Sequence, residues 1–213
     1  MIREHNWSAE TAKELANHFG GRVWCSVDPS DNGALIVWGA GGTPQACWSW
    51  IKTVKTTGRI VRSLARSGMP GVMVLERQFI GNNAKTSAII SRRAGVLMGA
   101  YDYAKNGAWD CVHAMPTTWQ SWLRSQPGCS ARECKDVKEA SIKRATQDAA
   151  VARFFGTKKP EQRSGIADAY CIGQAWQERV RAIRSENFGA SEQQAPAVQR
   201  QISADGVHIR FRR

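Results

Sequence analysis

The sequence lacks any long apolar run. No stretch approaches the roughly 18 to 20 consecutive apolar residues that a membrane-spanning helix needs. The first ten residues, MIREHNWSAE, are charged and do not contain the apolar segment of a signal peptide. We therefore expect a soluble, cytoplasmic protein with no membrane partner.

Metal-binding cysteine motifs are also missing. The six cysteines include no CxxC pair, and the two nearest to each other, Cys129 and Cys134, have no histidine nearby to complete a zinc set. The other four lie in apolar stretches, where a free cysteine behaves as a small hydrophobic residue. The sequence therefore favours reduced thiols in the core over a zinc site.

Acidic residues are scarce relative to basic ones. Eighteen Asp and Glu face thirty Lys and Arg, which gives a formal net charge of +12. Such a balance favours a polyanionic partner, with nucleic acid as the first candidate. The basic residues are spread along the chain and do not line one amphipathic helix, which disfavours a membrane surface. A merely basic protein without such a partner is the alternative.

The chain shows no internal repeat, and 213 residues suit one α/β domain. Three short strands rich in Val, Ile and Trp, joined by turn residues, predict an antiparallel meander. A later strand–helix–strand pattern predicts a parallel crossover, so we expect a five-stranded mixed sheet flanked by helices. The strands are predicted over 22–28, 34–39, 46–52, 72–75 and 109–115. Helices are predicted over 8–18, 58–68, 84–105, 116–125, 136–155 and 163–183.

These elements define three regions. Residues 1–20 are predicted to be an N-terminal helical extension, 21–184 the main α/β domain, and 185–213 a polar and basic tail. Gly95 and Gly99 interrupt the clearest helix and cost it about 1 kcal/mol each relative to alanine. Either another helix, of this chain or of a second subunit, approaches closely there, or the helix packs closely on its own sheet.

Three carboxylates stand among apolar residues. Asp28 and Glu76 each end a predicted strand, and Asp168 lies within the apolar segment GIADAYCIG. Singly, each has an ordinary interpretation as a turn, a strand end or a surface position on a helix. Together they indicate a site, because open α/β sheets place their sites at such strand ends. Convergent carboxylates suit Mg²⁺ or Mn²⁺, and in a basic protein two such ions indicate phosphodiester hydrolysis.

Three ordered segments resemble the RuvC-type Holliday junction resolvases. SVDPSDNGALIVW is similar to that family's first strand and turn, and VLERQFIGNNAKTSAIISRRAGVLMGA to its second acidic block. IADAYCIGQA resembles the family's last acidic segment, so the resemblance spans about residues 22–180. The compact length and divergent motifs fit a phage version.

The resemblance implies a ribonuclease-H-like fold, a homodimer, and Mg²⁺-dependent paired nicking of four-way DNA junctions. Carried over by position, the metal ligands are Asp28, Glu76 and Asp168. The family has a fourth ligand three residues before its last aspartate, where this chain has Gly165. Glu161 is the nearest upstream carboxylate that can substitute.

Basic and aromatic residues are candidates for DNA contact. The family's lysines in the segment before the last acidic block hold the scissile phosphate, and we assign Lys143 to this catalytic role. Phe79 stands where the family has an aromatic that stacks on bases. Trp119 and Trp122 are predicted to be core residues. The remaining candidates for phosphate contact, which makes binding salt-dependent, are Arg77, Lys85, Arg92 and Lys138.

The sequence therefore predicts a metal-dependent endonuclease that resolves four-way DNA junctions. Two alternatives are open. One is a ribonuclease-H-fold nuclease that acts on RNA or RNA–DNA hybrids. The other is a junction-binding protein that has lost cleavage together with the fourth ligand.

Overall fold

A computed structural model describes residues 3–6, 23–30, 32–39, 42–49, 71–77, 84–105, 109–156 and 158–192. The helices predicted over 8–18 and 58–68 lie outside these residues. The described elements are β1 (Arg3–Asn6), β2 (Val23–Asp28), β3 (Ala34–Trp38), β4 (Pro44–Ser49), β5 (Gly71–Glu76), α3 (Ala84–Lys105), β6 (Trp109–Ala114), α4 (Pro116–Ser125), α5 (Val137–Thr146), α6 (Ala149–Ala152) and α7 (Pro160–Glu192).

The described strands form one mixed sheet in the order β1-β6-β5-β2-β3-β4. Strands β2, β3 and β4 make the predicted antiparallel meander. Strand β5 lies parallel to β2, and β6 and β1 continue the parallel part. The mixed α/β fold is thus confirmed, with all five predicted strands present.

The sixth strand, β1, was not predicted. It consists of Arg3–Asn6 and pairs in parallel with β6 at one edge of the sheet. Its sequence, REHN, has no apolar alternation. Short, charged strands are typical of sheet edges, and they carry little sequence signal. These residues therefore belong to the sheet, whereas the sequence had placed them in an extension outside the shared core.

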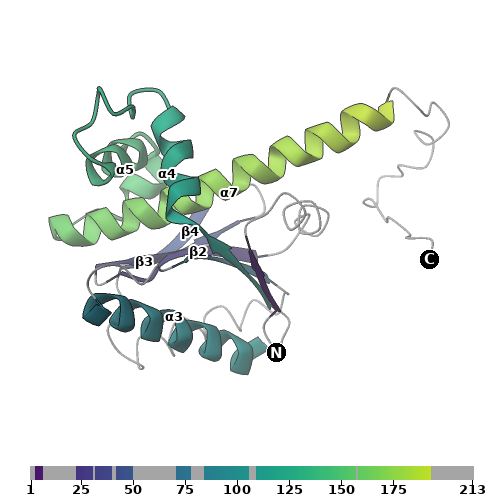
Figure 1. Cartoon of the computed structure of the whole chain (residues 1–213). Helices are drawn as coiled ribbons and strands as arrows, with labels where there is room; N and C mark the ends of the chain where they lie inside the picture. The colour runs from purple at the N-terminus through teal and green to yellow at the C-terminus, as the bar shows by residue number, and fades with distance from the viewer. Residues whose placement is uncertain are drawn as a thin grey trace.

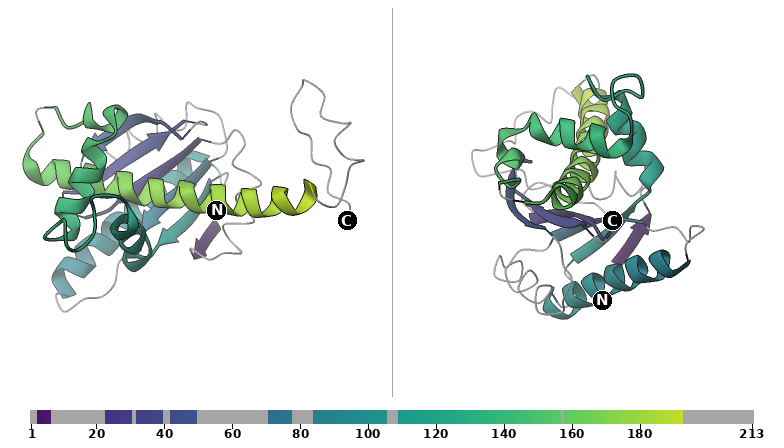
Figure 2. Two further views of the ribbon diagram at one scale, coloured as in Figure 1. Left: turned by 90° about the horizontal axis from the view of Figure 1, so that it is seen from above. Right: turned by 90° about the vertical axis from the view of Figure 1, so that its left-hand side faces the viewer.

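Helices cover both faces of the sheet (Figure 1), and the view from the side in Figure 2 separates the layers. Because strand side chains alternate between faces, β5 contributes to two cores. Val72 and Val74 face the core shared with α4, α5 and α7, while Met73 and Leu75 face the core under α3. A strand buried on both faces explains the continuous apolar run of this segment.

Helix α7 is the longest described element and lies across the sheet beside β2 and β3 (Figure 1). It begins at Pro160, a residue suited to the first turn of a helix, and it extends to Glu192, nine residues beyond the predicted end. The predicted helix over 136–155 is instead two helices. Asp148 separates them, because its side chain accepts a hydrogen bond from the Ala150 amide and caps α6.

Helix α3 spans the predicted residues 84–105. A Cβ atom added at Gly95 or Gly99 would meet nothing within 4 Å, and both residues are exposed. The alternative in which these glycines pack on their own sheet is therefore wrong. Ile89 and Val96, which are 37% and 39% exposed, lie on the same helix.

All six cysteines are free thiols, and five of them, including Cys129 and Cys134, are buried. Across the described ranges, no helix combines the length and apolarity needed to cross a membrane.

Candidate active site

Asp28 is the last residue of β2 and faces α7. Alternation along the strand puts it on the same face as Trp24, which packs in the core beneath that helix. The carboxylate is only 3% exposed. Ser30 holds both of its oxygens, since its amide donates to Oδ1 at 2.9 Å and its hydroxyl to Oδ2 at 2.8 Å.

Glu76 is the last residue of the neighbouring strand β5. It shares a face with Val72 and Val74, so it too projects toward the helices on the α7 side. The indole N–H of Trp119, on α4, donates to Glu76 Oε1 at 3.0 Å. Trp119 itself is 2% exposed, which confirms its prediction as a core residue. The end of β5 and the buried Trp119 ring therefore fix the orientation of the Glu76 carboxylate.

Asp168 lies on α7, and its Oδ1 atom is buried without a hydrogen-bond partner in the described part of the chain. Burial raises the pKa of this carboxyl well above its ordinary value of 3.8. The negative charges of Asp28 and Glu76 raise it further. Ser141 and Lys138 act in the opposite direction. The pKa of Asp28 is also raised by burial, opposed by its hydrogen bonds from Ser30 and by Lys138.

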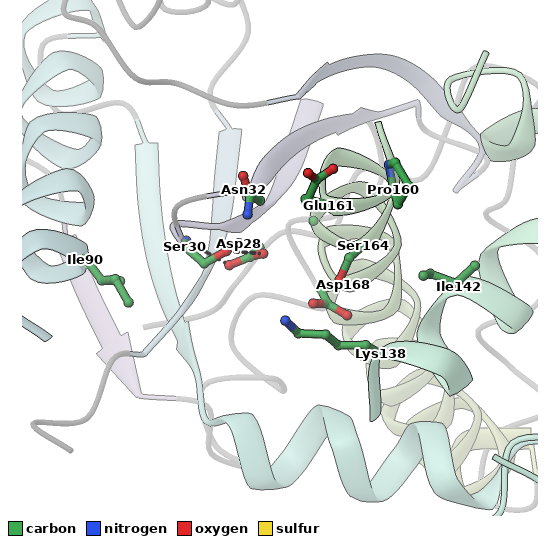
Figure 3. A pocket seen from close by; sticks show the side chains of 11 residues that line it. Asp28, Ser30, Asn32, Ile90, Lys138, Ile142, Pro160, Glu161, Ser164 and Asp168 are labelled. Atoms are coloured by element: carbon green, nitrogen blue, oxygen red, sulfur yellow. Dashed lines mark hydrogen bonds between the residues drawn. The ribbon is translucent and has the colours of Figure 1, made fainter. Parts of the chain in front are cut away.

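Asp28 and Asp168 line the same cavity, which has a volume of about 470 Å³. In Figure 3, Asp28 and Asp168 point toward one another, and the ammonium end of Lys138 lies beside them. Glu76 is not among the residues that line the cavity. The lining consists of Asp28, Ser30, Asn32, Ile90, Lys138, Ile142, Pro160, Glu161, Ser164, Gly165 and Asp168.

The donor chemistry of this cavity fits a hard divalent cation. Asp28 is buried, its charge raises the pKa of Asp168, and the buried Oδ1 atom of Asp168 has no hydrogen-bond partner among the described residues. A bound cation would offset the cost of each of these features. Among the described side chains, however, no group of three or more His, Cys, Asp or Glu is close enough to hold a metal ion. Asp28 and Asp168 are thus the pair that this structure brings together, and the charge of Glu76 raises the pKa of Asp168.

The structure places Lys138, and not Lys143, at the carboxylates. Lys138 lines the cavity and lowers the pKa of both aspartates. Lys143 lies on the other side of α5, where a Cβ atom added at Gly128 would be 3.2 Å from its Nζ atom. The two lysines are five residues apart on one helix, so they point in different directions.

Arg77 and Arg92, two of the other predicted contact residues, do not line the cavity. Arg77 follows Glu76 and is exposed, and Arg92 is exposed on α3. Lys85 lies in the first turn of α3. Phe79 lies outside the described residues.

Ser30, Ser164 and Trp119 are among the site residues that were not predicted, as are Asn32, Ile90, Ile142 and Pro160 of the lining. The Asp-x-Ser spacing is a turn signal in which a side chain bonds the backbone two residues on, and it is sufficient to find Ser30. No local pattern links Trp119 to Glu76, which lies 43 residues earlier in the chain.

The fold was compared with known proteins. No protein-family model matches the sequence, and no curated protein sequence matches it. Solved structures do match. The yeast mitochondrial Holliday junction resolvase Ydc2 has a TM-score of 0.54 at 9% identity, covering 86% of this chain and 90% of that chain.

Two structures of Thermus thermophilus RuvC are also similar. The complex with Holliday junction substrate has a TM-score of 0.48 at 14% identity, covering 79% of this chain and 96% of that chain. A second RuvC structure has a TM-score of 0.45 at 16% identity and covers 79% and 97%. Taken with the mixed sheet described above, the similarity to Ydc2 shows that the chain shares the fold of that protein.

Proposed function

We propose that this protein is a divalent-metal-dependent endonuclease that resolves four-way DNA junctions by paired nicks. The observation that carries the proposal is the pair Asp28 and Asp168, which face each other across one cavity with the Oδ1 of Asp168 unpartnered. Buried carboxylates without a cation are costly, and sites of this kind are retained for function.

The residues have separate roles in this proposal. Asp28 and Asp168, with Glu76 from the adjacent strand, would hold Mg²⁺ or Mn²⁺, and two ions are expected. Such ions, when bound, activate water and stabilise the departing 3′ oxygen. Lys138 is positioned to hold a phosphate oxygen beside the carboxylates. Ser30 and Trp119 fix the orientation of Asp28 and Glu76 through the hydrogen bonds described above.

Branched DNA is the proposed substrate. The net charge of +12 favours a polyanion, and Ydc2, whose fold this chain shares, is a Holliday junction resolvase. Paired nicks at a two-fold symmetric junction need two copies of the site, because each chain carries one. We therefore propose a homodimer, for which the exposed α3 face with Gly95, Val96 and Gly99 is the candidate interface.

The test uses three labelled substrates: a four-way junction, a linear duplex and an RNA–DNA hybrid, each with Mg²⁺. We expect paired nicks confined to the junction. Asp168→Asn and Glu76→Gln should abolish them while junction binding is retained. Cleavage of the hybrid alone would instead indicate a nuclease acting on RNA.

One observation favours the non-cleaving alternative. The position of the family's fourth ligand is Gly165, so one carboxylate of the expected set is missing. Junction binding without nicks in either Mg²⁺ or Mn²⁺ would support a binding protein and contradict the proposed nuclease.

A further inference from the structure

The start of α7 is in direct contact with the turn that follows Asp28. A Cβ atom added at Gly165 would lie 1.8 Å from the carbonyl oxygen of Asn32 and 2.7 Å from the Cα of Gly33. Gly33 and Gly165 also form an isolated β-bridge. All the nearest atoms belong to the backbone, so they cannot rotate away as a side chain would. No residue with a side chain fits at position 165 without moving the helix or the turn.

Gly33 in turn packs against the backbone of Asp28. A Cβ atom added at Gly33 would lie 1.9 Å from the carbonyl oxygen of Asp28. The Gly33 amide closes the turn by donating to the Ser30 carbonyl at 3.1 Å, and Ser30 in turn holds the Asp28 carboxylate. Asp168 lies three residues after Gly165, on the adjacent turn of the same helix. A path made of backbone atoms thus joins the two carboxylate residues.

We propose that Gly33 and Gly165 are positioning residues, whose side-chain-free contact sets the separation of Asp28 and Asp168 across the metal-binding cavity. This inference rests on the proposed function, because it takes the two aspartates to be ligands of a divalent cation. It also gives a physical reason for the missing fourth ligand. Position 165 is occupied by the contact itself, so an acidic side chain there would displace Asp168 before it reached a metal.

The effect on metal binding follows from the geometry. Metal sites tolerate little displacement of their ligands, and loss of the groups that orient a ligand costs about 10–100-fold in metal affinity. A methyl group at position 165 must move α7 away from the turn or open the turn itself. Either movement changes the distance between the two carboxylates.

The test compares two glycines of α7. Gly165→Ala introduces the clash with the turn, whereas Gly173→Ala introduces one with the side chains of Trp38 and Ser26 in the core and none with the backbone of the turn. Mn²⁺ affinity is measured by calorimetric titration at a temperature where circular dichroism shows each variant folded. We expect Gly165→Ala to lose about 10–100-fold in affinity and Gly173→Ala to retain the wild-type value. Equal affinities in Gly165→Ala and the wild type, or equal losses in the two variants, would overturn the proposal.

Hydrogen–deuterium exchange of the wild-type chain provides a second measurement that does not depend on a variant folding. Because the contact couples the two segments, Mg²⁺ should slow amide exchange in the turn at 32–33 and in the first turns of α7 together. Slowing in α7 alone would overturn the proposal. If the wild-type chain binds no Mn²⁺ at all, the proposed function fails, and this inference fails with it. Binding that is insensitive to Gly165→Ala contradicts the inference alone.

Discussion

At the scale of single residues, the site is defined by charges held where water cannot solvate them. Asp28 is 3% exposed, and the Oδ1 of Asp168 is buried without a partner. Burial disfavours the ionised form of a carboxyl, and at Asp168 the charges of Asp28 and Glu76 add repulsion. The raised pKa of each aspartate is the consequence. A bound cation reverses both effects, which is why the metal-free and metal-bound forms should differ in stability.

The first prediction concerns Asp168→Asn in the absence of metal. The raised pKa means that the folded chain binds more protons than the unfolded chain between pH 3.8 and the raised value. The free energy of unfolding therefore falls as the pH rises through that range. Asparagine removes this loss, so at pH 7 in EDTA the variant should be more stable than the wild type by about 1 kcal/mol or more. Below about pH 4 the two should converge.

Urea unfolding between pH 4 and pH 8 measures this difference. Mg²⁺ should stabilise the wild type and leave Asp168→Asn unchanged. Glu178→Gln is a control, because Glu178 is an exposed carboxylate on the same helix that does not line the cavity. A variant less stable than the wild type at pH 7 would contradict the prediction.

The second prediction concerns the indole that holds Glu76. Trp119→Phe keeps most of the buried ring but removes the N–H that donates to Oε1 at 3.0 Å. Because a ligand that is no longer oriented binds metal less well, Mn²⁺ affinity should fall by about 10-fold or more. The matched control is Trp122→Phe, whose indole N–H donates to Glu178 instead. Titration with Mn²⁺ should give a lower affinity for Trp119→Phe than for Trp122→Phe. Equal affinities would show that Glu76 does not need this hydrogen bond.

At the scale of elements, alternation along a strand decides to which face of the sheet each strand-end carboxylate projects. Asp28 and Glu76 end neighbouring parallel strands and project to the same face, where α4 and α7 lie. This part of the site follows from sequence, because a strand has a fixed period of two and its end is marked by the change to polar residues. The sequence predicts three further features in the same way: the strand positions, the range of α3 and the placement of Asp168 after the last strand.

The remaining features depend on contacts between distant segments. The choice between Lys138 and Lys143 depends on how α5 rotates against α7, and no local pattern fixes that rotation. The contact between Gly33 and Gly165 joins residues far apart in the chain, so the sequence shows only an absent ligand. Strand β1, four polar residues long, is recognisable only through its pairing with β6.

The third prediction tests the orientation of α5. Lys138→Ala should reduce junction nicking by about 100-fold, because it removes the cation that lines the cavity and is positioned for a phosphate oxygen. Lys143→Ala, an equal loss of charge on an exposed residue of the same helix, should have little effect. Loss of the Lys138 charge also raises the pKa of both aspartates, so the pH profile of nicking should move to higher pH. Equal losses in the two variants would indicate a general effect of charge.

At the scale of the whole molecule, one chain provides one pair of facing aspartates, Asp28 and Asp168, while a four-way junction presents two strands to cut. Helix α3 covers the sheet face opposite α7 (Figure 2). Its outer surface carries two glycines that contact nothing in the described structure and two exposed aliphatic side chains. Glycine in a helix interior is unfavourable by itself, and the described residues give no packing reason for two glycines on one exposed face. A second copy that approaches closely at this face provides one.

The last prediction tests whether a second copy packs on α3, by means of the double variant Gly95→Ala, Gly99→Ala. In a monomer, the substitutions only improve helix propensity and should raise stability by roughly 1 kcal/mol each, since no atom of the described residues lies within 4 Å of either new methyl group. In a dimer packed through this face, the same methyl groups separate the helices and weaken association. We therefore expect sedimentation velocity to show a dimer for the wild type and a higher dissociation constant for the variant, with paired nicks replaced by single ones. Ser121→Ala, on the exposed face of α4, is the control and should remain dimeric. A variant that is more stable but associates as the wild type does would exclude α3 as the interface.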